Sequence, residues 1–515
     1  MPAVHAVVEV EREAKLVAPT GLALPDISRI VPGARMVAQP DEHLVATYYD
    51  TSDLRLARSG ITVRHRSGEA GPAWTVKLPD DGDATSVSRR EVRIDGTEQV
   101  VPDLAADLVL ASRRTRPLEP VARITTARRR TVLVDADGRA LAEVADDTVS
   151  IAGAHDGARS FREVEVELRD RGDAVAGLLD AAAALLVGAG CLAEAPIPKL
   201  VRALGDDALR PADVVVPEIG ADATAAELVR HALARCVAAM LRHDPGVRLG
   251  GDEEAVHDFR VATRRLRSDL RSFAVLLDRG ALAHVRSELG WLGALVGVLR
   301  DTDVLAGRLA RDLAELPARD RDAAEPLVSH LGRQAASARD DLLAAMRDER
   351  YVLLVDSLVE VARVPPLRRG SRRATAPAAA HVSSVARRPW QRLAAGVRSL
   401  GEEPSDAELH RVRILAKRCR YAAEAVAPVA GPGAARFASA VADVQTLLGD
   451  HQDAVVAQAF LAGAAGLAAG REGDRELRAV VAALIELERS RQSELRSRWP
   501  GTWRAASAKD LRRWL

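Results

Sequence analysis

The chain has 515 residues, which predicts two or three domains, and its 73 basic and 73 acidic side chains leave no formal net charge. Hydrophobic residues make up 48% of the chain but aromatic residues only 3%, so Ala, Val and Leu must build most of each core, which favours long helices. Three scattered cysteines exclude a disulfide framework and a thiolate zinc site, and the longest apolar runs fall short of the ~20 residues of a membrane helix. The N-terminus, MPAVHAVVEVEREAK, is acidic where a signal peptide is basic and apolar, so we expect a soluble cytoplasmic protein.

The first 170 residues alternate between stretches of period two and turn signals, as antiparallel strands do. This pattern predicts eight strands, near residues 4–16, 44–50, 61–67, 72–79, 86–95, 121–134, 139–150 and 160–168. Helical patterns lie near residues 52–59, 100–112 and 172–188. Because the strands carry many charges on one face, we expect an α+β domain whose eight-stranded antiparallel sheet closes into a β-barrel with a polar lumen.

Periodicity is lost over residues 205–224, GDDALRPADVVVPEIGADAT, which read as a linker between domains. The chain before residue 211 carries 27 basic and 33 acidic residues, and the chain after residue 210 carries 46 and 40. We predict a first domain over 1–205, a linker over 206–222, and an all-α domain over 223–515 with parts near 223–363 and 382–515. The predicted helices of the second domain are 224–243, 251–277, 281–298, 302–314, 320–362, 382–399, 405–427, 432–448, 452–468 and 473–497.

Two parts of the helical region resemble each other. HDFRVATRRLR begins at His257 and HRVRILAKRCR begins at His410, at an offset of 153 residues. Downstream, VGVLRD ends at Asp301 and LGDHQD ends at Asp453, at an offset of 152. The repeat is too long for a solenoid and predicts two helical bundles about a pseudo-twofold axis. The two aspartates are interpreted either as helix-start caps or as partners that orient arginines.

Charged side chains alternate along the predicted strands, beginning with Glu9, Glu11, Glu13 and Lys15, so each set projects from one face of its strand. A solvated edge strand would explain the first set alone, but other strands repeat the pattern. The other sets are Arg64 and Arg66; Thr75 and Lys77; Arg89, Glu91 and Arg93; Arg128 and Arg130; Glu143 and Asp147; and Glu163, Glu165 and Glu167. Clustered carboxylates bind hard divalent cations and guanidinium groups bind phosphate oxygens, so we expect metal and phosphate substrate to meet in the lumen.

The stretch EREAK from Glu11 to Lys15 matches the ExExK signature of the CYTH family, the triphosphate tunnel metalloenzymes, and the later charged strands follow that family's order. The resemblance covers residues 3–205 and implies a tunnel that binds a triphosphate together with Mg²⁺ or Mn²⁺. It implies catalytic roles for Glu11 and Glu13, and substrate-binding roles for Lys15, Arg64, Arg66, Lys77, Arg89, Glu91, Arg128 and Lys199. The implied metal ligands are Glu11, Glu13, Glu143, Asp147, Glu165 and Glu167. Which acidic pair contacts the metal, and whether Arg128, Arg129 or Arg130 points inward, are left open.

The implied reaction is metal-dependent hydrolysis of inorganic triphosphate or a related short triphosphate, since the family includes inorganic triphosphatases. Thiamine triphosphatase and adenylate cyclase activities are alternatives from the same family, and a cyclase would need a nucleobase pocket that the sequence does not identify. A third alternative is a non-catalytic protein that binds or targets polyphosphate. The sequence contains no Walker loop and no recognisable nucleophile motif.

The repeated motif places its basic side chains within an arc of roughly 80° on each helix. An ordinary solvated face gives no reason for the same spacing to occur twice. Over residues 220–510 the chain resembles the CHAD domain, a helical family associated with binding inorganic polyphosphate. The implied polyphosphate-binding residues are His257, Arg260, Arg264, Arg265, Arg267, Arg271, His410, Arg413, Lys417, Arg418 and Arg420. The scarcity of aromatic residues argues against nucleic acid as the partner. Because the CHAD resemblance implies polyphosphate binding, we expect a cytoplasmic protein that associates with polyphosphate granules.

Overall fold

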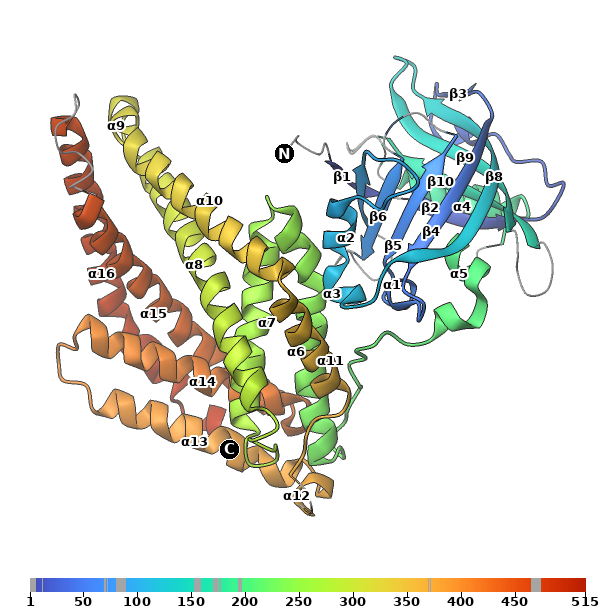
Figure 1. Ribbon diagram of the computed structural model, residues 1–515. Helices are drawn as coiled ribbons and strands as arrows, with labels where there is room; N and C mark the ends of the chain where they lie inside the picture. Colours follow the sequence, from blue (N-terminus) through green and yellow to red (C-terminus); the bar gives the residue numbers. More distant parts are fainter. Residues whose placement is uncertain are drawn as a thin grey trace. The chain divides into compact units, whose positions relative to one another are not determined.

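The computed structural model describes residues 6–11, 13–68, 71, 73–79, 89–151, 159–169, 175, 177–192, 197–368, 370, 372–464 and 474–515, with the backbone alone for 6–11, 89, 159 and 474. It contains two compact units, Met1–Asp213 and Val214–Leu515 (Figure 1). Their boundary falls between residues 206 and 222, where the sequence loses periodicity. Within the described residues, no helix combines the length and the apolar character needed to cross a bilayer.

The first unit is a curled antiparallel sheet (Figure 1). Its strands are β1 (Ala6–Glu11), β2 (Glu13–Ala18), β3 (Arg35–Ala38), β4 (Glu42–Asp50), β5 (Thr62–Ser67), β6 (Trp74–Pro79), β7 (Arg89–Ile94), β8 (Glu119–Val134), β9 (Ala140–Ile151) and β10 (Arg159–Leu168). The strand order is β1-β7-β6-β5-β4-β8-β9-β10-β2, and β3 pairs with β8 outside this path. Because β1 and β2 are consecutive in sequence, the order returns to its starting point, and the predicted antiparallel sheet curled around a lumen is confirmed. In the part of the chain that the structure describes it has ten strands and not eight, because the predicted strand 4–16 is divided into β1 and β2 and because β3 is added.

Short helices accompany this sheet. They are α1 (Arg55–Arg58), α2 (Asp103–Leu108), α3 (Leu110–Arg113), α4 (Leu178–Gly188) and α5 (Lys199–Leu204). Leu178 and Leu186 of α4 are buried in one cluster with Val164 and Val166 of β10, so α4 covers the apolar outer face of the sheet. The chain pattern did not predict β3 or α5, which have only four and six residues and so offer too little periodicity.

Residues just beyond α5 remain bound to the first unit. The carboxylate of Asp213 pairs with Arg58 at 2.8 Å and with Arg114, and the Pro211 carbonyl accepts a hydrogen bond of 2.7 Å from Arg58. Arg114 is only 4% exposed, so this ion pair is largely removed from water. The N-terminal half of the stretch without periodicity is therefore held by side-chain contacts that no periodic pattern reveals.

All the regular elements that the structure describes in the second unit are helices (Figure 1). Its helices are α6 (Ala225–Leu249), α7 (Glu253–Ser272), α8 (Ala283–Ala314), α9 (Ala318–Ala323), α10 (Glu325–Arg347), α11 (Glu349–Arg363), α12 (Arg372–Thr375), α13 (Ala379–Arg398), α14 (Asp406–Ala430), α15 (Pro432–Ala464) and α16 (Asp474–Ala506). The predicted breaks at 298–302 and 448–452 are wrong, because α8 and α15 run through both positions. Asp301 and Asp453 therefore lie inside helices and cap none.

The duplication is visible in the backbone. Helix α7 begins at Glu253 and α14 begins at Asp406, an offset of 153 residues, and the two helices pack against each other. Thr224 forms an isolated antiparallel bridge with Pro377, which is its own equivalent at the same offset. A pair of equivalent residues that contact each other lies on the axis that relates two copies, so the two halves are arranged about a pseudo-twofold axis. The predicted duplicated helical architecture is confirmed.

Candidate functional site

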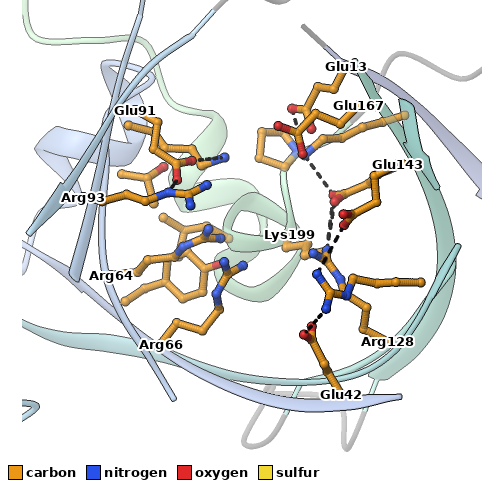
Figure 2. Close-up of a pocket in the computed structure, with 18 of the residues that line it drawn as sticks. Glu13, Glu42, Arg64, Arg66, Glu91, Arg93, Arg128, Glu143, Glu167 and Lys199 are labelled. Atoms are coloured by element: carbon orange, nitrogen blue, oxygen red, sulfur yellow. Dashed lines mark hydrogen bonds and ion pairs between the residues drawn. The ribbon is translucent and has the colours of Figure 1, made fainter. Parts of the chain in front are cut away.

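The lumen of the first unit contains a cavity of about 260 Å³. Charged side chains from eight strands and from α5 line most of it, and Figure 2 shows how they face one another. The lining residues are Glu13, Lys15, Glu42, Tyr48, Thr62, Arg64, Arg66, Lys77, Glu91, Arg93, Arg128, Arg130, Glu143, Glu165, Glu167, Arg169, Pro198, Lys199 and Leu200. A cavity this polar suits a small, highly charged ligand.

One wall of the cavity is basic. Arg64 and Arg66 alternate along β5, so both point into the lumen, and Arg93 of β7 lies on the same side in Figure 2. Lys77 of β6 pairs at 2.8 Å with Glu91 of β7, which is 1% exposed and also accepts a 2.7 Å hydrogen bond from Arg93. This buried carboxylate fixes two of the cations in place, while the wall as a whole keeps an excess of positive charge.

The facing wall carries a row of three carboxylates. Glu13 of β2 is directly opposite Glu167 of β10, and Glu167 is directly opposite Glu143 of β9. Opposed residues in neighbouring strands have Cβ atoms about 5 Å apart, so three like charges stand side by side. Burial raises the pKa of Glu167, and repulsion from its two neighbours adds to this, against the attraction of Arg169. We call these three residues the carboxylate row.

Cations at the edges of the carboxylate row compensate part of its charge. Lys15 Nζ lies 3.1 Å from Glu13, and Arg169 donates to Glu143 at 2.9 Å. Arg130 bridges Glu42 at 2.8 Å and approaches Glu143 at 3.7 Å. The oxygens of the row nevertheless border the cavity, and a divalent cation prefers carboxylate oxygens of this kind. The donor set therefore fits a hard divalent cation.

A second acidic group lies deeper, near α5. Ligand oxygens of Asp147, Glu163 and Glu165 all lie within 4.8 Å of one another, close enough to hold a metal ion together. The ammonium group of Lys199 stands among them, with Nζ 2.5 Å from Asp147, 2.9 Å from Glu163 and 3.4 Å from Glu165. Arg128 also bridges two of them, at 2.7 and 2.9 Å. In this arrangement the three carboxylates, which we call the lysine triad, already have an internal cation.

The lysine triad titrates unevenly. Burial raises the pKa of Glu163 to about 7, although Lys199 opposes the shift. Burial also disfavours the charged form of Glu165, but attraction to Lys15, Lys199 and Arg128 outweighs it and holds that pKa well below its usual range. Within the lysine triad, Glu163 therefore takes up a proton much more readily than Glu165 does.

Most residues predicted for this site line the cavity. Those with described side chains that do so are Glu13, Lys15, Arg64, Arg66, Lys77, Glu91, Arg128, Glu143, Glu165, Glu167 and Lys199. Asp147 does not, because it is fully buried behind Arg128 and Lys199. The side chains of Glu11 and Arg89 lie outside the described residues. Of the three consecutive arginines, Arg128 and Arg130 point inward, and Arg129 is 65% exposed and pairs with Asp146.

Several lining residues were not singled out from the sequence, and these are Glu42, Tyr48, Thr62 and Arg169. Arg93 and Arg130 were placed on charged strand faces, but no binding role was predicted for them. Period two already placed Thr62 on the face of Arg64 and Arg93 on the face of Glu91, so that signal was available. For Tyr48 there was no such signal, because a tyrosine in a strand resembles a core residue. Burial disfavours the ionised form of Tyr48, but attraction to Arg64 and Lys199 outweighs this and lowers its pKa.

The helical unit gathers a second set of charges. Arg260 and Arg264 of α7 and Arg413 and Lys417 of α14 lie near one another, and we call them the basic cluster. Burial lowers the pKa of Lys417 to about 7, and repulsion from the three arginines contributes. Asp301 of α8 pairs with Arg260 at 2.8 Å. This contact supports the interpretation of Asp301 as a partner that orients an arginine, and not its interpretation as a helix cap.

The remaining predicted basic residues differ between the two helices. Arg265 pairs with Glu424, which also accepts a 2.7 Å hydrogen bond from Arg420. Arg267, Arg271 and Arg418 are exposed. His257 and His410 are half-buried, and burial followed by repulsion from Arg300 lowers the pKa of His257. All described positions from both predicted basic arcs therefore lie on α7 or α14, but not all have the same electrostatic surroundings.

Comparison with known proteins identifies both units. A CYTH domain model matches residues 9–187 and a CHAD domain model matches residues 231–462. An uncharacterised protein of Mycobacterium tuberculosis is 34% identical over 484 residues, which are 89% of this chain and 89% of that protein. Among solved structures, PptA from Streptomyces chartreusis is 24% identical and matches 55% of this chain and 100% of its own, with a TM-score of 0.47. The CHAD domain from the plant Ricinus communis is also 24% identical and matches 56% of this chain and 95% of its own, with a TM-score of 0.46.

These matches agree with the geometry of both units. CYTH domains are triphosphate tunnel metalloenzymes that depend on metal, and the first unit has a charged lumen with acidic groups that could hold an ion. The curated relative is similar along nearly its whole length, across both domains. The chain belongs to the family of proteins in which a CYTH domain is followed by a CHAD domain.

Proposed function

We propose that the first unit hydrolyses inorganic triphosphate in a metal-dependent reaction, and that the helical unit binds inorganic polyphosphate. The observation that carries the first part is the division of one small cavity into a basic wall and the carboxylate row (Figure 2). A triphosphate needs cationic groups along its length, and its hydrolysis needs charge compensation where the phosphoryl group is transferred.

The basic wall would bind and orient the substrate. Arg64, Arg66 and Lys77 extend over two neighbouring strands, and guanidinium groups bind phosphate oxygens in a bidentate manner. Positioning of this kind supplies much of the catalysis of phosphoryl transfer. Lys15 stands at the opposite edge, 3.0 Å from Glu165, and would hold the far end of the substrate.

The carboxylate row would hold the metal. Glu13, Glu143 and Glu167 offer oxygens that border the cavity, whereas the ammonium group of Lys199 already stands among the carboxylates of the lysine triad. A bound Mg²⁺ or Mn²⁺ supplies charge neutralisation at phosphate oxygens and lowers the pKa of water. A carboxylate of the row accepts the proton of the attacking water, and the arginines of the opposite wall stabilise the negative charge that develops on the transferred group.

The cavity favours a substrate without a large organic group. Its volume of about 260 Å³ lies below the ~300–1,000 Å³ of typical small-molecule pockets. Among the described residues that line it, Tyr48 is the sole aromatic side chain, so a base or a thiamine ring would find little to stack on. We therefore place inorganic triphosphate ahead of thiamine triphosphate and ATP.

The helical unit offers the basic cluster to a polyanion. The cluster combines side chains from both repeats, so a chain bound there would contact α7 and α14 together. Burial lowers the pKa of Lys417 and repulsion among these cations adds to the shift, so a bound polyanion would relieve unfavourable charge density. Polyphosphate needs only charge, whereas nucleic acid recognition also uses aromatic stacking. Binding of this kind would associate the protein with cytoplasmic polyphosphate granules.

Phosphate release tests the tunnel assignment. The full chain is supplied in turn with tripolyphosphate, thiamine triphosphate, ATP and long polyphosphate, with Mg²⁺, with Mn²⁺, or with a chelator. We expect the highest rate with tripolyphosphate and no activity with the chelator. Glu13→Gln should lower the rate at least about a hundredfold, and Asp137→Asn, on an exposed turn, should not. Tight binding of tripolyphosphate without release from any substrate would instead support the non-catalytic alternative, and cyclic AMP from ATP would support the cyclase.

Competition binding tests the helical assignment. Long polyphosphate, single-stranded RNA and duplex DNA are titrated into the full chain at two salt concentrations. Arg264→Gln and Arg413→Gln, one from each repeat, should weaken polyphosphate binding by comparable factors. Arg411→Gln, which changes a 69% exposed arginine of the same helix, is the matched control. Preference for either nucleic acid, or sensitivity to only one repeat, would contradict a shared polyphosphate site.

A further inference from the structure

The pseudo-twofold axis of the helical unit relates two contacts at equivalent positions that differ in charge. One contact joins opposite charges and the other joins like charges. Arg265 of α7 forms an ion pair with Glu424 of α14. At the offset of 153 residues, Arg265 corresponds to Arg418 and Glu424 corresponds to Arg271. A twofold relation requires that if one residue contacts a second, their equivalents also contact each other. The symmetry mate of this ion pair is therefore a pair of arginines.

The surroundings of Arg271 agree with this relation. Partial desolvation lowers its pKa, and repulsion from Arg418, Arg286 and Arg267 adds to the shift. The four guanidinium groups come from α7, α8 and α14, and all four residues are exposed to solvent. Over the described ranges, none of the four has a carboxylate within ion-pair distance. We call this group the open arginine site.

A neighbouring position also differs between the two halves. Tyr421 accepts a hydrogen bond of 3.3 Å from Arg264 and lies 5.7 Å from the Arg265 guanidinium, so its ring fills the space beside the ion pair. Its equivalent beside the open arginine site is Ser268, a much smaller side chain. One symmetry-related position thus has an aromatic ring and a carboxylate, and the other has a buried serine and unbalanced positive charge.

We propose that the open arginine site binds the terminal phosphate group of an inorganic oligophosphate whose chain continues along α7 to the basic cluster. This inference rests on the proposed binding of polyphosphate by the helical unit. The terminal phosphate of the chain has two ionisable oxygens and carries a charge of about −1.5 to −2 near neutral pH, whereas an internal phosphate has one ionisable oxygen and carries one charge. Four guanidinium groups without a carboxylate favour the more highly charged end of the chain.

The position of the site supports the same path. Arg271 lies near the C-terminal end of α7, and Arg260 lies eleven residues earlier, which is about 16 Å along the helix axis. Arg264 and Arg267 lie between them on the same face, so cations follow the helix without a large gap. On α14 the corresponding strip ends at Glu424, which would repel a polyanion. An oligophosphate therefore has one favoured end position in the helical unit.

Installing the missing carboxylate tests the proposal. Arg271→Glu should give Arg418 the partner that Arg265 already has, and it closes the site without removing the basic cluster. Arg279→Glu, at an exposed position in the turn after α7, makes the same change in charge and is the matched control. Both are made in the full chain with Arg64→Gln and Lys77→Gln, so that the tunnel does not bind the probe. The probes are tripolyphosphate and tripolyphosphate with both ends methyl-esterified, measured by calorimetry.

We expect Arg271→Glu to weaken binding of tripolyphosphate about tenfold to a hundredfold, as for loss of a charge-assisted contact, and Arg279→Glu to weaken it less than about twofold. Esterified ends should weaken binding to the parent protein similarly and make no further difference in Arg271→Glu. Equal effects of the two variants, or equal binding of both probes by the parent, would overturn the proposal. If Arg271→Glu fails to fold, Arg418→Gln carries the same expectations.

A failure of this inference can be distinguished from a failure of the proposed function. Long polyphosphate with esterified ends should still bind the parent protein and Arg271→Glu, and Arg264→Gln should weaken that binding. Retention of this behaviour without any end effect would refute only the terminal-phosphate site. No binding of long polyphosphate to the parent protein would refute polyphosphate binding by the helical unit and the inference with it.

Discussion

Lys199 is the cation that α5 places among the buried carboxylates of the lumen, and its removal should be costly. Its ammonium group contacts Asp147, Glu163 and Glu165 within 3.4 Å and is 14% exposed. Lys199→Met keeps the length and apolar part of the side chain but leaves three crowded carboxylates with less compensation. Arg128 still bridges two of them, so the fold should persist.

The expected loss of stability is about 3–5 kcal/mol, the range for breaking a buried ion pair by removing one partner. It should depend on pH through Glu163, whose pKa of about 7 in the folded protein lies above its ordinary 4.5. The folded state then binds more protons than the unfolded state between these values, so stability is greatest below about pH 4.5 and is lost as pH rises through about 7. Removing Lys199 removes the attraction that opposes this shift, so the deficit of the variant should be largest above pH 7.

Hydrogen exchange measured by mass spectrometry separates this unit from the helical one within the full chain. Amides of β9 and β10 that exchange through global opening of the unit should exchange about a hundredfold to a few thousandfold faster in Lys199→Met near pH 8. Lys509→Met, at an exposed position in the helical unit, is the control for loss of a lysine. Adding Asp147→Asn should restore much of the protection, because it removes one of the uncompensated charges. Unchanged exchange in Lys199→Met, or a deficit that does not shrink toward pH 5, would refute this account of the triad.

Three further predictions concern the metal, the basic cluster and the domain boundary. Glu13→Gln should weaken Mn²⁺ binding, measured by calorimetry without substrate, at least about tenfold, because an amide oxygen carries no charge. Affinity for long polyphosphate should fall as pH rises through about 7, since Lys417 is charged below that value and neutral above it; Lys417→Arg should abolish this decline in binding isotherms. A chain cut after Asp213 should give two folded pieces, and a first piece ending before Pro211 should melt at a lower temperature because it lacks the ion pairs of Asp213.

Period-two charge patterns predicted the cavity walls well because a strand allows only two faces. Period two places Glu13 and Glu167 on the inward faces of their strands, and both side chains line the cavity. The same rule cannot say how deep a side chain lies. Asp147 and Glu163 share inward faces with residues of the cavity wall, yet both are buried and contact Lys199. That difference depends on α5, which has only six residues.

The helical unit shows a different limit of sequence reasoning. Aspartate is common at helix starts, so Asp301 and Asp453 suggested that two helices end before them. Both helices continue through these positions, and each aspartate lies near an arginine of another helix. Arg260 reaches Asp301 at 2.8 Å, and attraction to Arg413 opposes the burial that raises the pKa of Asp453. Neither arginine is near its partner in sequence, so local pattern could not distinguish a cap from a long-range ion pair.

Duplication makes the charge differences in the helical unit informative in a way that a single basic helix would not be. In an isolated helix, an exposed arginine without a carboxylate has no reference against which its surroundings can be judged. Here Arg265 provides the reference for Arg418, because the two occupy equivalent positions and only one has an acidic partner. The fold plainly accommodates a carboxylate at the position of Glu424, and the same backbone places Arg271 at the equivalent position. Folding alone therefore gives no reason for arginine there, whereas an anionic ligand does.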